Sequence, residues 1–433
     1  MSTKKNVFVL GLTDVQRREL ETVRQAEEYA FHGVLDYDTL VNTTDLDFEQ
    51  LMRDARAELD AFDGSIDAII AHWDFPVSVM STMLAAEHDL PAPSLTSLLK
   101  SEHKGWSRLE QKKSVPECVP GFAVFDPFED DALAGIDLEF PFWVKPVKAH
   151  SSALGFKVED EAGFNEAVVE IREHIGEIGD AFNEVLQQVE LPPELAGAGG
   201  NSCLAEQFVE GIQAAPEGTM FRGEYRVHGV FDMHKDEAGT SFSRLDYPAS
   251  TVPEHVQQRM IDLTERYLRQ VGYDNGCFNS EFMWDEANDQ LWLIEINTRI
   301  SQSHSDLFAK VDGSSNHEVA IDIALGEPPR MPHREGDFAV ASQAMIFHDE
   351  DAIVTRVPSE EDKAEIERRF PGTVLTLMVG EGDRLSELPG QDSYRFVLGK
   401  LYLGANSTEQ MLENYAAITA ELPFEFAPAP TDD

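Results

Sequence analysis

The chain has 433 residues, of which 80 are acidic and 34 are basic, so its formal net charge is −46. A surface of this charge repels nucleic acid and anionic membranes at ordinary salt, and we expect neither as a partner. No apolar stretch approaches the about 18 residues that a membrane-spanning helix needs. The acidic residues are spread along the chain, as in halophilic proteins that work in molar salt, where screening acts over about 3 Å.

The three cysteines, Cys118, Cys203 and Cys277, are far apart and lack the spacing of a zinc site. We expect them to be reduced and buried. The start of the chain, MSTKKNVFVLGL, has an apolar run too short for a secretory signal and is typical of a first strand. These features predict a cytoplasmic enzyme or binding protein.

Residues 1–97 alternate strand and helix patterns, which predicts a small parallel α/β domain. The expected elements are Asn6–Leu12, Asp14–Tyr29, Ile66–Ala71 and Val77–His88. The loop Ala71–Phe75 follows a strand end, which is where open α/β sheets bind ligands. His72 and Asp74 in this loop are candidate substrate contacts, although ordinary polar loop residues are commoner.

Two lysines and a loop of small residues distinguish the next part of the chain. Lys104 lies in a segment that we expect to become helical after the capping residue Ser94. Lys145 interrupts the apolar strand Phe140–Val147, where a lysine costs free energy unless its ammonium group meets an anion. The loop Lys148–Val158 joins two strands, and its backbone N–H groups suit phosphate oxygens, although a plain hairpin loop is the commoner explanation.

The remaining elements are predicted from apolar periodicity and turn residues. Expected helices are Ala162–Val189, Pro253–Val271, Asn316–Ala324 and Ser407–Glu421. Expected strands are Ser202–Val209, Tyr225–Asp232, Ala339–Phe347, Gly372–Val379 and Tyr394–Gly404. The change of pattern near residue 331 predicts a small C-terminal α+β domain over residues 331–433.

The segment Gly276–Ser305 is the most informative, because it predicts a hairpin with two facing carboxylates. Its strands are Cys277–Trp284 and Leu291–Asn297, and we expect Trp284 to face Trp292. That register gives an apolar face of Phe278, Phe282, Trp284, Trp292, Ile294 and Ile296, with Phe282 opposite Ile294. The polar face then holds Asn279 opposite Asn297 and Glu281 opposite Glu295.

Two carboxylates that face each other on a sheet repel unless a cation lies between them. Hard oxygen ligands of this kind suit Mg²⁺, which takes one or two carboxylates and completes its shell with water and substrate phosphate. The alternative is that Glu281 and Glu295 belong to the solvent-facing side of an ordinary hairpin.

Taken in order, these segments resemble the ATP-grasp superfamily, and the resemblance spans Ser94–Pro329. It implies a pre-ATP-grasp α/β domain over residues 1–97, an ATP-grasp domain of two α+β lobes over 98–205 and 206–330, and the C-terminal domain. Lys104 in SEHKGWSR and Lys145 in FWVKPV are similar to the two nucleotide-binding lysines. The stretch His150–Phe156 resembles the phosphate flap, which implies Ser151, Ser152 and Gly155 as phosphate contacts.

The same resemblance assigns the rest of the site. AEQFVEG resembles the strand that holds adenine, with Glu206, Gln207, Val209 and Glu210 as nucleotide contacts. FNSEF and LIEINTR resemble the metal-binding strands. They imply Glu281, Glu295 and Asn297 as ligands of Mg²⁺ or Mn²⁺, and Arg299 as the catalytic cation that steadies a reacting acyl phosphate. Ser301, Ser303 and His304 follow as candidate substrate contacts.

The implied activity is that of an ADP-forming ligase, distantly similar to biotin carboxylase and D-alanine–D-alanine ligase. Such an enzyme uses ATP to activate a carboxylate as an acyl phosphate, which an amine, for example that of an amino acid, then attacks. Two alternatives are a carboxylase-like or phosphorylating ATP-grasp enzyme, and a non-catalytic ATP-binding regulatory protein. The oligomeric state stays open, with a homodimer as one option.

The sequence also departs from the family pattern. Gln213 stands where a ribose-binding glutamate is common, so Glu210 is an alternative ribose contact. Ser303 stands where the carboxylase branch has the glutamate base for bicarbonate, and the chain lacks a biotin-acceptor Met-Lys-Met sequence. Both departures disfavour bicarbonate chemistry.

Overall fold

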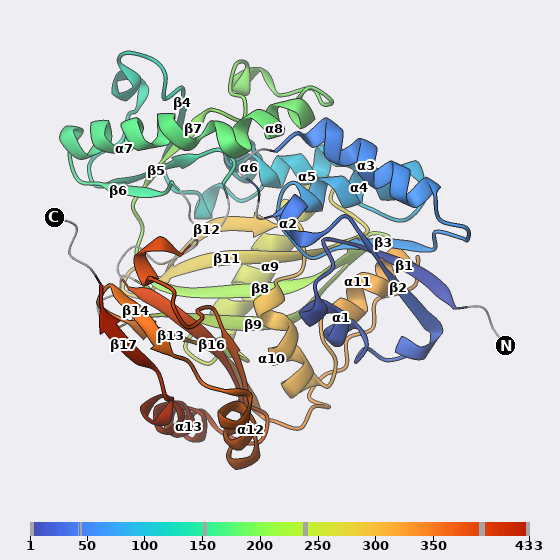
Figure 1. Cartoon of the computed structure of the whole chain (residues 1–433). Coiled ribbons are helices and arrows are strands. Elements are labelled where there is room, and N and C mark those ends of the chain that lie inside the picture. The colour runs from blue at the N-terminus through green and yellow to red at the C-terminus, as the bar shows by residue number, and fades with distance from the viewer. Residues whose placement is uncertain are drawn as a thin grey trace.

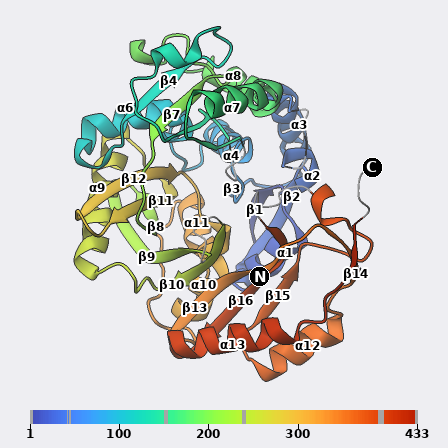
Figure 2. The same ribbon diagram turned by 90° about the vertical axis from the view of Figure 1, so that its left-hand side faces the viewer.

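The computed structural model describes residues 4–41, 43, 46–149, 154–236, 241–388 and 395–429 (Figure 1). These residues form sheets of three, four, eight and two strands. In both views the lobe with the four-stranded sheet lies at one end of the molecule, and helices α12 (Glu360–Arg369) and α13 (Thr408–Glu421) lie at the opposite end (Figures 1 and 2). The predicted mixture of α/β and α+β units is therefore confirmed.

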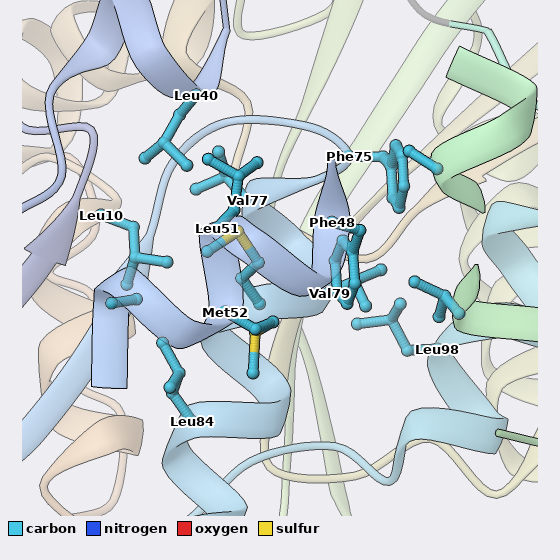
Figure 3. Close-up of a cluster of buried hydrophobic side chains, with 14 of the residues drawn as sticks. Leu10, Leu40, Phe48, Leu51, Met52, Phe75, Val77, Val79, Leu84 and Leu98 are labelled. Carbon is cyan, nitrogen blue, oxygen red and sulfur yellow. The ribbon is translucent and has the colours of Figure 1, made fainter. Parts of the chain in front are cut away.

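The N-terminal unit has a parallel sheet, as predicted, and the strand order of this sheet is β2–β1–β3. Its elements are β1 (Lys5–Leu10), α1 (Asp14–Leu20), β2 (Tyr29–Val34), α2 (Tyr37–Leu40), α3 (Phe48–Asp60), β3 (Ala68–Ala71) and α4 (Val77–Glu87). The predicted helix Asp14–Tyr29 is wrong beyond Leu20, because Gln25 adopts a positive φ of 66° and Tyr29 pairs with Lys5 in the sheet. The apolar cluster that packs these helices onto the sheet includes Leu10, Leu40, Phe48, Leu51, Met52 and Leu84 (Figure 3).

The first lobe is built on an antiparallel sheet of order β4–β7–β5–β6. Two helices precede it, α5 (Leu95–Glu102) and α6 (Lys104–Ser114), and the predicted cap is confirmed because Ser94 accepts a hydrogen bond from the Ser97 amide. The lobe's elements are β4 (Phe122–Phe125), β5 (Phe142–Pro146), β6 (Phe156–Val158), α7 (Glu161–His174), α8 (Gly176–Leu186) and β7 (Cys203–Gln207).

An eight-stranded sheet of order β12–β11–β8–β9–β10–β13–β16–β15 contains the strands of the second lobe and three strands that follow residue 330. Its strands are β8 (Ile212–Phe221), β9 (Glu224–Lys235), β10 (Phe242–Tyr247), β11 (Gly276–Asp285), β12 (Gln290–Asn297), β13 (Val340–His348), β15 (Val374–Leu377) and β16 (Phe396–Ala405). A small sheet pairs β14 (Ala352–Arg356) with β17 (Glu425–Pro428). Because β10 pairs with β13, the proposed domain boundary at residue 330 falls between two strands of one sheet.

Helix α9 (Glu254–Val271) packs on the apolar face of the hairpin β11–β12. It begins after Pro253 and ends at Gly272, whose φ of 74° suits glycine. Its buried face, which includes Met260 and Tyr267, shares one apolar cluster with Phe278 and other hairpin residues. Helices α10 (Gln302–Asp312) and α11 (His317–Ala324) follow the hairpin. Within the described ranges, no helix is long and apolar enough to span a membrane.

The hairpin has the predicted register at its polar end and a different one beyond a β-bulge. Asn279 lies opposite Asn297, and Glu281 lies opposite Glu295, as predicted. After the bulge the register shifts by one residue, so that Phe282 faces Leu293 and Trp284 faces Leu291. The prediction that Trp284 faces Trp292 is therefore wrong, and Leu291 and Leu293 take the core positions expected for Trp292 and Ile294.

The guanidinium of Arg108 on α6 explains why the bulge is stable. It donates to the backbone oxygens of Leu293 and Ile294, each at 2.8 Å from a terminal nitrogen. A bulge leaves strand carbonyls without a ladder partner. The buried arginine supplies the missing donors and thereby joins α6 to β12.

Candidate active site

The two facing carboxylates form the first part of the site. Asn297 donates to Glu281 Oε1 at 3.3 Å, and Gln213 donates to Glu281 Oε2 at 3.1 Å. Burial and the nearby charge of Glu295 raise the pKa of Glu281 to about 7. In the part of the chain that the structure describes, no group of three Asp, Glu, His or Cys side chains has the geometry of a metal site. Two carboxylates and one amide oxygen nevertheless fit Mg²⁺, whose remaining positions are usually filled by water and phosphate.

Both predicted lysines reach this region, and each meets a carboxylate. Lys104 is the first residue of α6, and its Nζ lies 2.8 Å from Glu295 Oε1 and 3.1 Å from the Ala149 oxygen. Burial alone would raise the pKa of Glu295, but the charges of Lys104 and Lys145 lower it. The site therefore brings Lys104 directly to the hairpin carboxylates.

Lys145 on β5 pairs with Glu206 on β7, which is the anion that a lysine in an apolar strand requires. Glu206 also accepts from Arg108. Burial alone would raise the pKa of Glu206, but the charges of Arg108 and Lys145 lower it to about 2. The carboxylate of Glu206 therefore stays ionised between two cations.

The other predicted nucleotide contacts lie around β7 and β6. Gln207 ends β7 with an exposed side chain that accepts from the Gly121 amide at 3.2 Å. Val209 and Glu210 follow in the connection to β8, and Gly155 directly precedes β6. Ser151 and Ser152, like His150, lie outside the described residues.

Arg299 follows β12, and its side chain turns toward the N-terminal domain. Its Nη2 lies 3.3 Å from Asp74 Oδ2, and its Nη1 donates to the Ile300 oxygen at 3.2 Å. Burial would lower the pKa of Arg299, but the charges of Asp74 and Glu102 raise it. Of the two candidates in the loop after β3, Asp74 thus joins the site. His72 instead is buried, with Nε2 3.1 Å from Nδ1 of His317.

Of the three candidate substrate residues, two are half-buried and one is buried. Ser301 and Ser303 are half-buried, and their hydroxyl oxygens lie 3.2 Å apart. His304 is buried, pairs through Nδ1 with Glu217, and stacks on Phe231 with ring centroids 3.6 Å apart. His304 therefore packs in the protein interior beside the two serines.

Sequence reasoning missed two charged residues beside this site, Glu102 and Lys148. Lys148 is 4% exposed and pairs with both Asp74 and Glu102. A signal was present, because Lys148 follows the Lys-Pro pair by two residues in an apolar context. A buried lysine at this position needs carboxylates nearby, but their identity depends on tertiary contacts with residues far along the chain.

Comparison with known proteins agrees with this geometry. Residues 240–331 match the family described as carbamoyl-phosphate synthase L chain, ATP binding domain. The carbamoyl phosphate synthase large chain of Clavibacter sepedonicus is 32% identical over 111 residues, which are 26% of this chain and 10% of that protein. The corresponding protein of Mycobacterium tuberculosis H37Rv is 31% identical over 142 residues, 32% of this chain and 12% of that protein. The match thus spans about a tenth of the length of these curated relatives.

Solved structures match over nearly the whole chain. The L-amino acid ligase from Bacillus licheniformis has a TM-score of 0.72 at 16% identity, covering 99% of this chain and 100% of that one. A biotin carboxylase complex from Campylobacter jejuni has a TM-score of 0.62 at 13% identity, covering 98% and 92%. At such identities the similarity concerns the fold. The chain therefore has the fold of these solved enzymes, and its residues 240–331 are similar to an ATP-binding domain.

Proposed function

We propose that the protein is an ADP-forming ligase that joins a small carboxylic acid to an amine, for example that of an amino acid. The observation that carries this proposal is the meeting of Glu281 and Glu295 with Lys104 at the polar end of one hairpin. Paired carboxylates beside a lysine suit a nucleoside triphosphate with its divalent cation. The L-amino acid ligase with the same fold supports ligation.

The nucleotide is assigned to the residues between the two lobes. Lys104 and Lys145 are point charges for phosphate oxygens. The flap residues Ser151, Ser152 and Gly155 would cover the phosphates. The adenosine contacts would be Glu206, Gln207, Val209 and Glu210, with the side chain of Glu206 committed to its two cations.

Glu281, Glu295 and Asn297 would hold Mg²⁺ or Mn²⁺. When bound, the cation neutralises charge on the phosphate oxygens and orients the phosphate for in-line transfer. Burial and then the nearby charge of Glu295 raise the pKa of Glu281, and a divalent cation would favour the ionised form of both carboxylates.

The reaction that these groups support has two steps. An oxygen of the acid attacks the γ-phosphorus of ATP, the bond to the bridging oxygen breaks, and ADP leaves. The amine nitrogen then attacks the acyl carbon, phosphate leaves with the electron pair of the C–O bond, and the nitrogen loses a proton. Arg299 would hold the acid, because a guanidinium can bind a carboxylate bidentately. Ser301 and Ser303 would contact the acid or amine, and His304 would shape the wall behind them.

The activity is tested by ADP release with pairs of acids and amines, and by mass spectrometry of the products. We expect ADP release to require both partners and the product to contain an amide bond. Bicarbonate dependence or a stable phosphorylated product would contradict ligation in favour of a carboxylase-like or phosphorylating enzyme. ATP binding without turnover across a broad metabolite panel would favour a regulatory protein.

We also infer a cytoplasmic protein with the three domain divisions given above. Its partners would be the two small-molecule substrates, with a homodimer as one option. The spread of acidic residues supports a halophilic protein, because a net charge of −46 is costly without screening.

A further inference from the structure

Four charged side chains from four separate segments form one connected cluster beside the end of β12. They are Asp74 after β3, Glu102 at the end of α5, Lys148 after β5 and Arg299 after β12. Lys148 Nζ lies 2.8 Å from Asp74 Oδ1 and also pairs with Glu102. The Thr298 hydroxyl donates to Glu102 at 2.9 Å, so the cluster is tied to the end of β12 twice.

The position of Asp74 within this cluster is well defined. Its Oδ1 accepts from Lys148 and from the Phe75 amide at 2.7 Å, and its Oδ2 faces Arg299 at 3.3 Å. Each carboxylate oxygen therefore serves a different cation. Because Lys148 is 4% exposed, its charge depends on Asp74 and Glu102 for compensation.

We propose that Asp74 is a positioning residue of the ligase site, through which the N-terminal domain fixes the orientation of Arg299. This inference rests on the proposed function, in which Arg299 holds the reacting acid. In this role Asp74 acts on the acid only through Arg299. It restrains the guanidinium on one oxygen and is itself held by Lys148 and the Phe75 amide on the other.

Loss of the Asp74 carboxylate should lower the rate of ligation and leave nucleotide binding largely unchanged. Without the negative charge of Asp74, Arg299 can turn away from the acid and Lys148 is left with Glu102. A displacement of about 1 Å at a reacting centre costs about 100-fold in rate. The ATP-binding lysines Lys104 and Lys145 pair elsewhere, with Glu295 and Glu206, so ATP affinity should be unaffected.

The test uses the full chain with Asp74→Asn, which keeps the shape of the side chain and removes its charge. Asp67→Asn is the matched control, because Asp67 lies at the other end of β3 and accepts from the Asn6 amide at 2.7 Å. We expect Asp74→Asn to lower kcat at least about 10-fold with unchanged ATP affinity by calorimetry, and Asp67→Asn to change neither. Combined with Arg299→Lys, Asp74→Asn should add little further loss. Turnover of Asp74→Asn within about twofold of the wild type, or losses that multiply fully in the double variant, would overturn the inference.

A second measurement does not need turnover. Phenylglyoxal modifies arginine side chains, and mass spectrometry of peptides reports the modification of Arg299. We expect Arg299 to react faster in Asp74→Asn than in the wild type or in Asp67→Asn, and equal rates would overturn the inference. If Asp74→Asn does not fold, Asp74→Glu replaces it, since it keeps the charge but moves the carboxylate by one methylene. Full turnover of that variant with unchanged modification of Arg299 would also overturn the inference. Absence of ADP release from the wild type would instead contradict the proposed function, while the modification rates still report on Asp74.

Discussion

The ammonium group of Lys104 lies 2.8 Å from the carboxylate of Glu295. Lys104, which we assign to phosphate binding, thus forms an ion pair with Glu295, which we assign to cation binding. Phosphate and cation would bind together. Lys104 would then leave the carboxylate of Glu295 for a phosphate oxygen, and Glu295 would leave the ammonium group of Lys104 for the cation. Neither of these half-buried charges is left without compensation in this exchange, which matters because a charge removed from water is destabilising when it is unpaired.

Replacement of Glu295 by Gln separates its role as a ligand from its role in folding. We expect Glu295→Gln to fold, because the amide still accepts a hydrogen bond from Lys104. Turnover should fall by more than the about 100-fold that outer-shell partners of a metal contribute. ADP release measured across a titration of Mg²⁺ checks this. Glu286→Gln, on the exposed turn of the same hairpin, is the control and should keep full activity. Unchanged turnover of Glu295→Gln would remove the metal assignment.

Glu281→Gln should stabilise the protein in the absence of divalent cations. The pKa of Glu281 is raised from 4.5 to about 7, so the folded state loses stability as the pH rises through this interval. Removing one of two facing charges should raise the free energy of unfolding above about pH 7 by up to about 1 kcal/mol. Thermal unfolding with and without Mg²⁺ checks this, since the cation should stabilise the wild type and not the variant. Equal stabilisation by Mg²⁺ in both proteins would contradict the assignment.

The polar end of the hairpin was predictable because it depends on local alternation. The strands repeat every two residues, so the facing pairs at Glu281 and Asn279 follow once a register is chosen. The bulge was not predictable, because it depends on Arg108, which is 185 residues from Leu293 along the chain. A donor from that distance leaves no signal in the hairpin sequence itself.

Two further differences between the predicted and the observed strands also depend on pairing between strands. Strand β8 went unpredicted because it contains Pro216 and Gly218, which are uncommon within central strands. The structure accommodates them with a register shift between Glu217 and Gly218. The predicted helix Asp14–Tyr29 reached the first residue of β2, because the polar residues before Tyr29 fit a helical pattern, whereas parallel pairing with Lys5 of β1 decides the structure at Tyr29.

Lys145→Met should weaken ATP binding and leave the fold intact. Glu206 keeps Arg108 as a partner in this variant, so its buried charge stays compensated. Loss of a hydrogen bond to a charged group costs about 1.5–3 kcal/mol, which is about 10- to 100-fold in the dissociation constant. Calorimetry with ATP measures the loss. Lys113→Met on α6 is the control and should bind ATP normally, because buried Glu110, the partner of the half-exposed Lys113, keeps the hydrogen bond from the side-chain amide of Gln270 at 3.3 Å.

Two histidines, the buried His103 and the half-buried His228, predict acid sensitivity. Burial lowers the pKa of His103 and of His228 from 6.5 to about 4. The unfolded chain binds protons at these positions below pH 6.5 and the folded protein does not, so stability should fall as the pH falls from 6.5 to about 4. Each full pKa unit corresponds to about 1.4 kcal/mol. Urea unfolding across this range should show a shallower dependence on pH in His228→Gln than in the control His255→Gln, whose histidine is exposed. Parallel curves would contradict the assignment of acid sensitivity to these histidines.

The surface charge predicts a requirement for salt. At a net charge of −46, mutual repulsion of carboxylates opposes the folded state. Screening shortens from about 10 Å at 0.1 M salt to about 3 Å at 1 M, so refolding yield, melting temperature and activity should all rise with KCl over this range. Sucrose at matched osmolality separates screening from the general exclusion of solutes, because it stabilises folded proteins without screening charge. KCl should therefore exceed sucrose in effect, and a preference for low salt would contradict the halophilic interpretation.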